Sequence, residues 1–187
     1  MNTYKGKLLA HYERFWSRPV WLGRWKEPPH SSLAAMPVEF EVARFRRSPD
    51  TDVYATVAMS EPGMDSVLEL HVIAGTSSDE VADRIVELLT VTAHYHRTGA
   101  ALRIGHSVNF GEPWVAGSAC THGLISLPYL DGPSLERVAE SDATCAWLLP
   151  ITPSEVALKK SAGLDALEER FERAELNYLD WMRRPVV

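Results

Sequence analysis

The sequence has few cysteines and no long apolar run, and each shortage excludes a class of protein. Only two of its 187 residues are cysteines, Cys120 and Cys145, too few for a disulfide framework and typical of a reducing compartment. No stretch approaches the roughly 20 apolar residues that a membrane-spanning helix needs. The N-terminal segment mixes charged with apolar side chains, unlike a secretory signal. We therefore expect a cytoplasmic protein that does not enter a membrane.

Motifs for cofactor and metal binding are also missing. Neither of the glycine-rich patterns that cradle nucleotide phosphates occurs in the sequence. Seven histidines are present, but no H-E-x-x-H and no C-x-x-C. His94 and His96 are two positions apart in a predicted helix, so they point in different directions. The sequence predicts no cofactor and no metal site.

One short motif keeps an enzyme hypothesis open. Residues 105–109 (GHSVN) resemble the nucleophile motif G-x-S-x-G, with Ser107 as the nucleophile and His106 or His122 as its base. That motif requires a helix directly after the serine. Gly111 and Pro113 follow instead, and they interrupt a helix rather than begin one. A serine hydrolase is therefore the alternative hypothesis, and it requires Ser107 within hydrogen-bond reach of a histidine.

Charge is distributed unevenly along the chain. The overall composition, 45% apolar and 24% charged, is typical of a globular domain, with a net charge of −6. Residues 1–47 carry nine Lys/Arg against four Asp/Glu, whereas the remainder carries ten against twenty-one. An acidic body is poorly suited to nucleic acid and well suited to a basic protein partner.

Three tryptophans near the N-terminus allow a second binding hypothesis. Trp16, Trp21 and Trp25 lie among cations and could stack single-stranded bases, although packing onto a sheet is the favoured interpretation.

Hydrophobic periodicity predicts an α+β domain. Alternating and β-branched patterns indicate strands, and apolar residues at helical spacing indicate helices. Acidic residues begin the helix expected at 79–98 and Gly99 ends it, while Thr152, Pro153 and Glu155 form a capping box for another helix. The predicted strands are 38–45, 53–59, 67–73, 102–108, 120–127 and 143–149, and further helices are expected at 4–15 and 164–176. We expect a mixed β-sheet flanked by helices over residues 38–187, preceded by an N-terminal helix and an irregular wrapping segment over 1–37.

The order of several segments resembles the suppressor of fused domain family over about residues 38–187. The matching stretches are YATVAMS at 54–60, LELH at 68–71, the helix 79–98, GHS at 105–107, LISLPY at 124–129, WLLPIT at 147–152, Gly163 to Leu167 and DWMRR at 180–184. The resemblance implies a protein-binding module without catalytic activity. The animal member restrains Gli-type transcription factors and has a long C-terminal domain without a counterpart here. The short form looks like the bacterial branch, whose members are proposed as immunity proteins against toxins.

The resemblance also points to candidate contact residues. Tyr54 matches an aromatic position that lines the peptide groove of the animal form. Ser60 follows in the same matching stretch, and Asp65, Asp79 and Asp83 belong to the densest acidic part of the chain, residues 61–87. We expect these five residues to contact a protein partner, which would be a basic toxin neutralised by occlusion or the target of an interaction adaptor.

Overall fold

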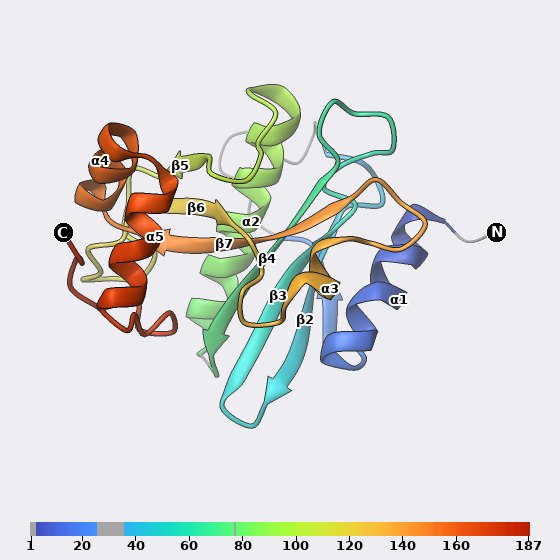
Figure 1. The fold of residues 1–187 in the computed structure, drawn as a ribbon. Helices are drawn as coiled ribbons and strands as arrows, with labels where there is room; N and C mark the ends of the chain where they lie inside the picture. Colours follow the sequence, from blue (N-terminus) through green and yellow to red (C-terminus); the bar gives the residue numbers. More distant parts are fainter. Residues whose placement is uncertain (1–2, 26–35, 77) are drawn as a thin grey trace.

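The computed structural model describes residues 3–25, 36–76 and 78–187 (Figure 1). Their strands form one seven-stranded sheet with the order β1-β2-β3-β4-β7-β6-β5. Only the β4–β7 pair is parallel among these strands, so the sheet is mixed. The strands are β1 (Trp21–Gly23), β2 (Glu41–Ser48), β3 (Thr51–Val57), β4 (Leu68–Gly75), β5 (Ser107–Asn109), β6 (His122–Ser126) and β7 (Thr144–Ile151).

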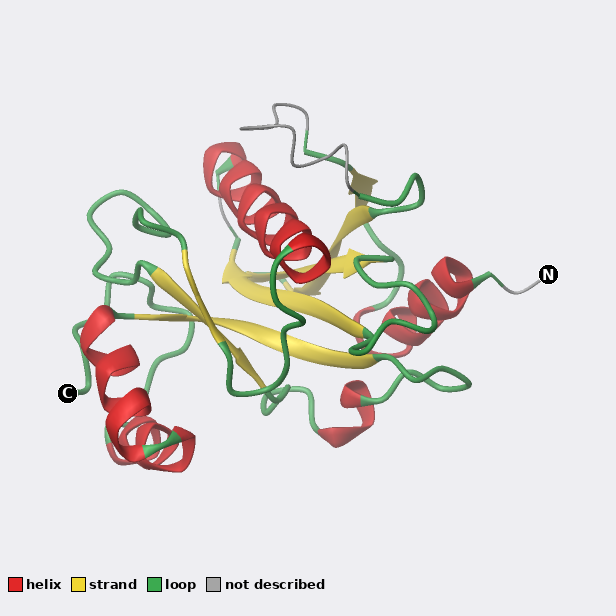
Figure 2. Cartoon of the chain, turned by 90° about the horizontal axis from the view of Figure 1, so that it is seen from above, coloured by secondary structure: helices red, strands yellow, loops and turns green. Residues whose placement is uncertain are grey.

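Helices cover both faces of the sheet. The helices are α1 (Tyr4–Trp16), α2 (Asp79–Thr98), α3 (Pro133–Glu136), α4 (Pro153–Ala162) and α5 (Leu164–Arg173). Figure 2 shows α2 alone on one face, with α1, α3 and the α4–α5 pair on the opposite side. Each face has its own hydrophobic core. On β4, Leu68, Leu70 and Val72 belong to the α2 core, as the alternation of side chains along a strand requires.

Local sequence signals explain where α4 begins and how it is held. Thr152 Oγ1 accepts a hydrogen bond from the Glu155 backbone N–H at 3.4 Å, and Glu155 Oε2 accepts one from the Thr152 N–H at 2.8 Å. The predicted capping box is therefore formed. Glu155 also receives two hydrogen bonds from the Arg183 guanidinium, at 2.6 and 2.9 Å. This buried ion pair ties the C-terminal segment to α4.

The α+β class and the mixed sheet are confirmed, and three local expectations need correction. Residues Trp21–Gly23, expected in an irregular segment, form the edge strand β1. The strand expected at 102–108 is confined to Ser107–Asn109, because Gly105 has a φ of +85° and the His106 N–H bonds back to the Arg103 carbonyl in a turn. The short helix α3 begins at Pro133, directly after its N-cap Gly132, and is too short for hydrophobic periodicity to predict.

Candidate partner-binding site

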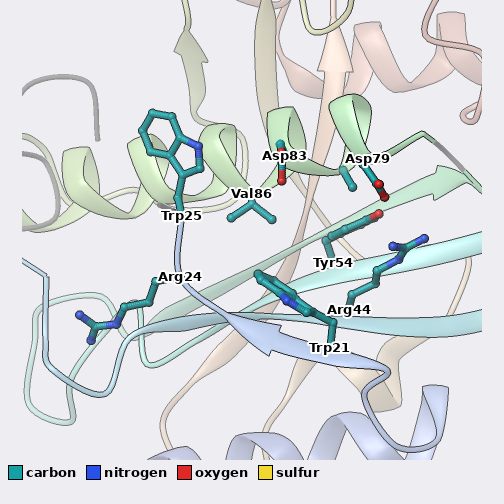
Figure 3. Close-up of a pocket in the computed structure, with 9 residues that line it drawn as sticks. Trp21, Arg24, Trp25, Arg44, Tyr54, Asp79, Asp83 and Val86 are labelled. Atoms are coloured by element: carbon teal, nitrogen blue, oxygen red, sulfur yellow. The ribbon is translucent and has the colours of Figure 1, made fainter. Parts of the chain in front are cut away.

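A cavity of about 580 Å³ lies between α2 and the strands at the β1 edge (Figure 3). It is lined by Trp21, Arg24, Trp25, Arg44, Tyr54, Asp79, Ala82, Asp83 and Val86. The α2 residues form one wall, and residues from β1, β2 and β3 form the floor. A volume of this size falls in the range of about 300–1,000 Å³ that is usual for small-ligand pockets.

The floor of the cavity is one row of side chains across three strands. In the antiparallel register Trp21 lies opposite Arg44, and Arg44 lies opposite Tyr54. Directly opposed residues on neighbouring strands point to the same face of a sheet. Three residues far apart in the sequence therefore come together beneath α2.

The indole of Trp21 lies against Gly23 in the same strand. A Cβ atom at Gly23 would lie only 2.6 Å from Trp21 Cζ2, so a larger residue there would displace the ring. Trp21 remains 40% exposed, an unusual degree for so large an apolar side chain. The missing side chain of Gly23 thus lets Trp21 lie along the strand and present its ring to the cavity.

The two arginines of the cavity have partners within the protein. The Arg44 guanidinium donates to Asp52 Oδ2 from Nε at 3.0 Å and from Nη2 at 2.6 Å, and it lies 5.5 Å from the centre of the Tyr54 ring. Asp52 is fully buried and also lies 2.8 Å from Arg46 Nε. Arg24 donates to the Pro37 carbonyl at 2.6 Å, and its side chain points away from the cavity in Figure 3.

The two acidic residues of the wall are not held by an ion pair to a described residue, although the charge of Asp79 acts on Arg44. Asp79 and Asp83 are exposed, lie one helical turn apart, and form no ion pair with any residue that the structure describes. A second cavity of about 670 Å³ adjoins the first at Trp25 and Asp83 and is also lined by Glu80, Glu87 and Glu112. There Arg84 is 2.7 Å from Glu87 and 3.7 Å from Glu112. The exposed side of α2 is therefore acidic over both cavities.

The five predicted contact residues separate into two groups. Tyr54, Asp79 and Asp83 line the first cavity, near the N-terminal end of α2. Ser60 and Asp65 belong to the β3–β4 connection, which packs near the C-terminal end of α2, where Ser60 Oγ lies 3.1 Å from His96 Nε2. A helix of twenty residues is about 30 Å long, so the two groups do not form one site.

Ser60 is buried, whereas Asp65 is exposed. The Ser60 hydroxyl donates to the Leu68 carbonyl at 2.7 Å and accepts from the Leu68 N–H at 2.9 Å. His96 Nδ1 accepts the Leu102 N–H at 2.9 Å, so its proton is on Nε2, the nitrogen that faces Ser60. Ser60 therefore joins the β3–β4 connection to α2, and in this tautomer His96 cannot serve it as a base.

Nothing in the sequence indicates that Trp21, Trp25 and Arg44 line one cavity, and packing is the interpretation that it favours for the tryptophans. Trp16 does pack, being 2% exposed, whereas Trp21 is 40% exposed and Trp25 half-buried. Lys26, one of the cations near these tryptophans in the sequence, lies outside the described residues.

The environment of Ser107 does not supply the histidine that the hydrolase hypothesis requires. Lys159 Nζ lies 3.2 Å from Ser107 Oγ and donates to the Gly105 carbonyl at 2.5 Å. Among the hydrogen bonds of the described residues, none joins Ser107 to a histidine, and His122 Nδ1 is instead 2.9 Å from Thr121 Oγ1. The predicted Ser–His pair is therefore not formed in this structure.

The opposite face of the sheet holds a buried carboxylate. Glu69 is fully buried, and four groups donate to it: Tyr4 Oη at 3.0 Å, Thr56 Oγ1 at 2.6 Å, and the Met59 and Ser60 N–H groups at 3.2 Å each. Burial raises the pKa of Glu69 to about 7, and the four hydrogen bonds oppose a larger rise.

His71 and Cys145 are buried on the same face. Burial lowers the pKa of His71 to about 4 and raises that of the Cys145 thiol. A neutral imidazole beside a neutral thiol is not an activated nucleophile.

The described parts of the chain contain no metal-binding cluster, no disulfide and no membrane-spanning helix. No three His, Cys, Asp or Glu side chains gather there so that they could hold a metal ion. Cys120 and Cys145 are both buried and free. None of the helices in the described ranges has the length and apolar character needed to cross a membrane.

Comparison with known proteins places this architecture in a structural class. A crystal structure of a SUFU (suppressor of fused protein) homologue from Neisseria gonorrhoeae FA 1090 is 27% identical, with a TM-score of 0.78 over 98% of this chain and 97% of that one. The crystal structure of the Sufu–Fu complex is 13% identical, with a TM-score of 0.68 over 98% of this chain and 92% of that one. The search of curated proteins gave no match. The fold is that of a single SUFU-like α+β domain.

The sequence itself supports the same assignment. Residues 36–184 match the family model described as suppressor of fused protein (SUFU). The chain belongs to the suppressor of fused family. The helix α1 and the strand β1 lie before the matched range, and both pack on the sheet that the matched residues form.

Proposed function

We propose that this chain is a non-catalytic, cytoplasmic protein-binding module that docks a basic protein partner on the α2 side of its sheet. The single observation that carries the proposal is the cavity beneath α2, where the exposed Asp79 and Asp83 form no ion pair with a described residue and lie beside the exposed ring of Trp21. Unpaired exposed carboxylates attract a basic surface over a long range, and aromatic side chains supply contact area after docking. The Sufu–Fu complex supports protein binding as the function of this fold.

The partner we propose is a basic toxin, which would make this chain an immunity protein, and the adaptor alternative involves the same surface. Neutralisation would occur by occlusion: the acidic side of α2 covers basic residues that the toxin needs for its own target. No reaction is required of the immunity protein in such a mechanism. The steering charge raises the association rate, and the contacts in the cavity determine the lifetime of the complex.

The experiment that tests this proposal is affinity capture from a lysate of the native cells, with paired baits. The wild-type chain should retain a basic protein at low salt and release it at high salt. The Asp79→Lys/Asp83→Lys bait should not retain that protein. Asp165→Lys is the matched control, because Asp165 is also an exposed acid in the first turn of a helix, but at α5.

The captured protein then decides between the two versions of the proposal. Expressed alone, a toxin should arrest growth, and co-expression of the wild-type chain should restore it, whereas the Asp79→Lys/Asp83→Lys variant should not. With purified partner, the double reversal should slow association at least about tenfold at low salt and flatten its salt dependence. Unchanged association kinetics would refute electrostatic docking at α2.

A further inference from the structure

We propose that the cavity between α2 and β1 binds one arginine side chain that the partner presents. This inference rests on the proposed function and adds the chemistry of the group that the site recognises. It follows from the two exposed carboxylates of the cavity wall, from the aromatic side chains beside them, and from how the two are placed relative to each other.

The two exposed carboxylates of the cavity form no ion pair with a described residue. Arg44 shares the buried Asp52 carboxylate with Arg46, and Arg24 donates to the Pro37 and Val38 carbonyls. Asp79 and Asp83 are these two carboxylates, and both lie on the wall that α2 contributes (Figure 3). Carboxylates at positions i and i+4 of a helix lie about 5–6 Å apart at Cβ, so one ligand with several donors can reach both.

The aromatic surfaces favour a flat cation over a spherical one. The ring of Trp21 lies over Gly23 with 40% of the residue exposed, and half-buried Trp25 lines the same cavity. A guanidinium is planar, stacks on aromatic faces, carries five N–H donors and is more weakly hydrated than an ammonium. It can therefore lie on an indole and donate at its edges to carboxylates. An ammonium is a compact, strongly hydrated charge that does not match a flat surface as well.

The fold already contains the same arrangement once. Arg44 lies 5.5 Å from the centre of the Tyr54 ring while it donates to Asp52. An aromatic face, a guanidinium and a carboxylate are thus combined at one end of the cavity, using residues of the chain itself. Trp21 lies opposite Arg44 in the strand register and, together with Asp79 and Asp83, offers an aromatic face and carboxylates to a second guanidinium.

The test uses three short peptides that differ at one position. Acetyl-Gly-Arg-Gly-amide is titrated into the full chain, and the indole N–H signals of Trp21 and Trp25 are followed by NMR. The lysine peptide tests for a generic cation, and the citrulline peptide keeps the shape of arginine without its charge. We expect saturable shifts with arginine, binding several-fold weaker with lysine, and none with citrulline.

Variants separate the two walls of the site. Asp79→Asn/Asp83→Asn should weaken arginine binding at least about tenfold, because two charge-assisted hydrogen bonds are lost. Gly23→Ala should weaken it several-fold without changing any charge, since the new Cβ displaces the Trp21 ring. Asp165→Asn, the matched acid at α5, should leave the affinity unchanged.

Three results would overturn the inference: no shift of either indole at tens of millimolar peptide, equal shifts with all three peptides, or lysine binding as well as arginine. Each can be separated from failure of the proposed function. If the captured partner requires Asp79 and Asp83 but the arginine peptide does not bind, docking at α2 stands and the arginine site fails. If the peptide binds while partner capture is indifferent to Asp79 and Asp83, the arginine site stands and the proposed docking fails.

Discussion

Both faces of the sheet hold a buried carboxylate, Glu69 on one and Asp52 on the other, but the α2 side also carries exposed acids beside a cavity. On the face covered by α1, the buried carboxylate of Glu69 receives four hydrogen bonds. On the α2 face, Asp79 and Asp83 are exposed beside a cavity and form no ion pair with a described residue. A buried charge is tolerated only where donors converge on it, whereas an unpaired charge remains at the surface, where a ligand can reach it. The α1 face therefore holds a charge that the fold itself satisfies, and the α2 side carries the two acids proposed to bind a partner.

Aromatic residues show the same contrast. Trp16 on α1 is 2% exposed. Its ring centroid lies 5.3–5.4 Å from those of Tyr12, Phe45 and His71. Trp21 on β1 is 40% exposed and covers a glycine. The same residue type thus contributes to a packed core at Trp16 and to an open surface at Trp21.

The largest expected effect comes from removing these two tryptophans in turn. Trp16→Ala should lower the free energy of unfolding by about 3–5 kcal/mol, because it leaves a cavity among buried rings. Trp21→Ala should lower it by less than about 1 kcal/mol, since its ring is partly in water already. Urea unfolding of both variants measures the difference. Equal losses would contradict the contrast between a packed and an open tryptophan.

The second prediction concerns the pH dependence of Glu69. Its pKa in the folded protein, about 7, is raised above the ordinary value of 4.5. The folded protein therefore binds the proton of Glu69 more tightly than the unfolded chain does. This proton contributes its full stabilisation below pH 4.5, and the contribution is lost as the pH rises through 7. Glu69→Gln cannot titrate. The free energy of unfolding of the wild type minus that of Glu69→Gln should thus fall by about 1–3 kcal/mol between pH 5 and pH 8.

Comparing the two proteins at each pH cancels the histidines, whose titration is common to both. His71, for example, has a pKa lowered by burial and contributes a dependence of the opposite sign. Urea unfolding at several pH values provides the measurement. Parallel pH profiles for wild type and Glu69→Gln would show that Glu69 does not bind a proton in this range.

Sequence periodicity was sufficient for the elements that carry strong local signals. The apolar stripe and acidic first turn of 79–98 correspond to α2, and Thr152 with Glu155 corresponds to the cap of α4. The strand β1 could not be found in this way, because three residues are too few to show alternation. It forms because β2 offers its edge, so its existence depends on tertiary structure.

The cavity depends on tertiary structure even more. Trp21, Arg44 and Tyr54 meet only through the register of three strands, and no spacing in the sequence encodes that register. Asp79 and Asp83 were selected from acidic density, and they do line the cavity with Tyr54. Ser60 and Tyr54, which the same resemblance indicates, are both buried, at 0% and 1% exposed, but only Tyr54 lines the cavity. The sequence could indicate which residue types bind, but not which of them face solvent.

The smallest expected effect sharpens the comparison on the α2 side. Asp79→Asn removes an acid from the first turn of α2, where the helix dipole favours it by about 0.3–1 kcal/mol. Asp83→Asn relieves repulsion between like charges at i and i+4, worth about 0.2–0.5 kcal/mol. The two changes oppose each other.

The double variant Asp79→Asn/Asp83→Asn should therefore keep its free energy of unfolding within about 0.5 kcal/mol of wild type, although it removes two of the charges proposed to bind the partner. Differential urea unfolding at low salt, where the surface charges are least screened, is the most sensitive measurement. Single substitutions usually lower the free energy of unfolding by about 0.5–3 kcal/mol. If the double variant lowers it by about 2 kcal/mol or more, these carboxylates stabilise the fold after all. The α2 face would then resemble the α1 face, and a role in stability would explain the acids without any partner.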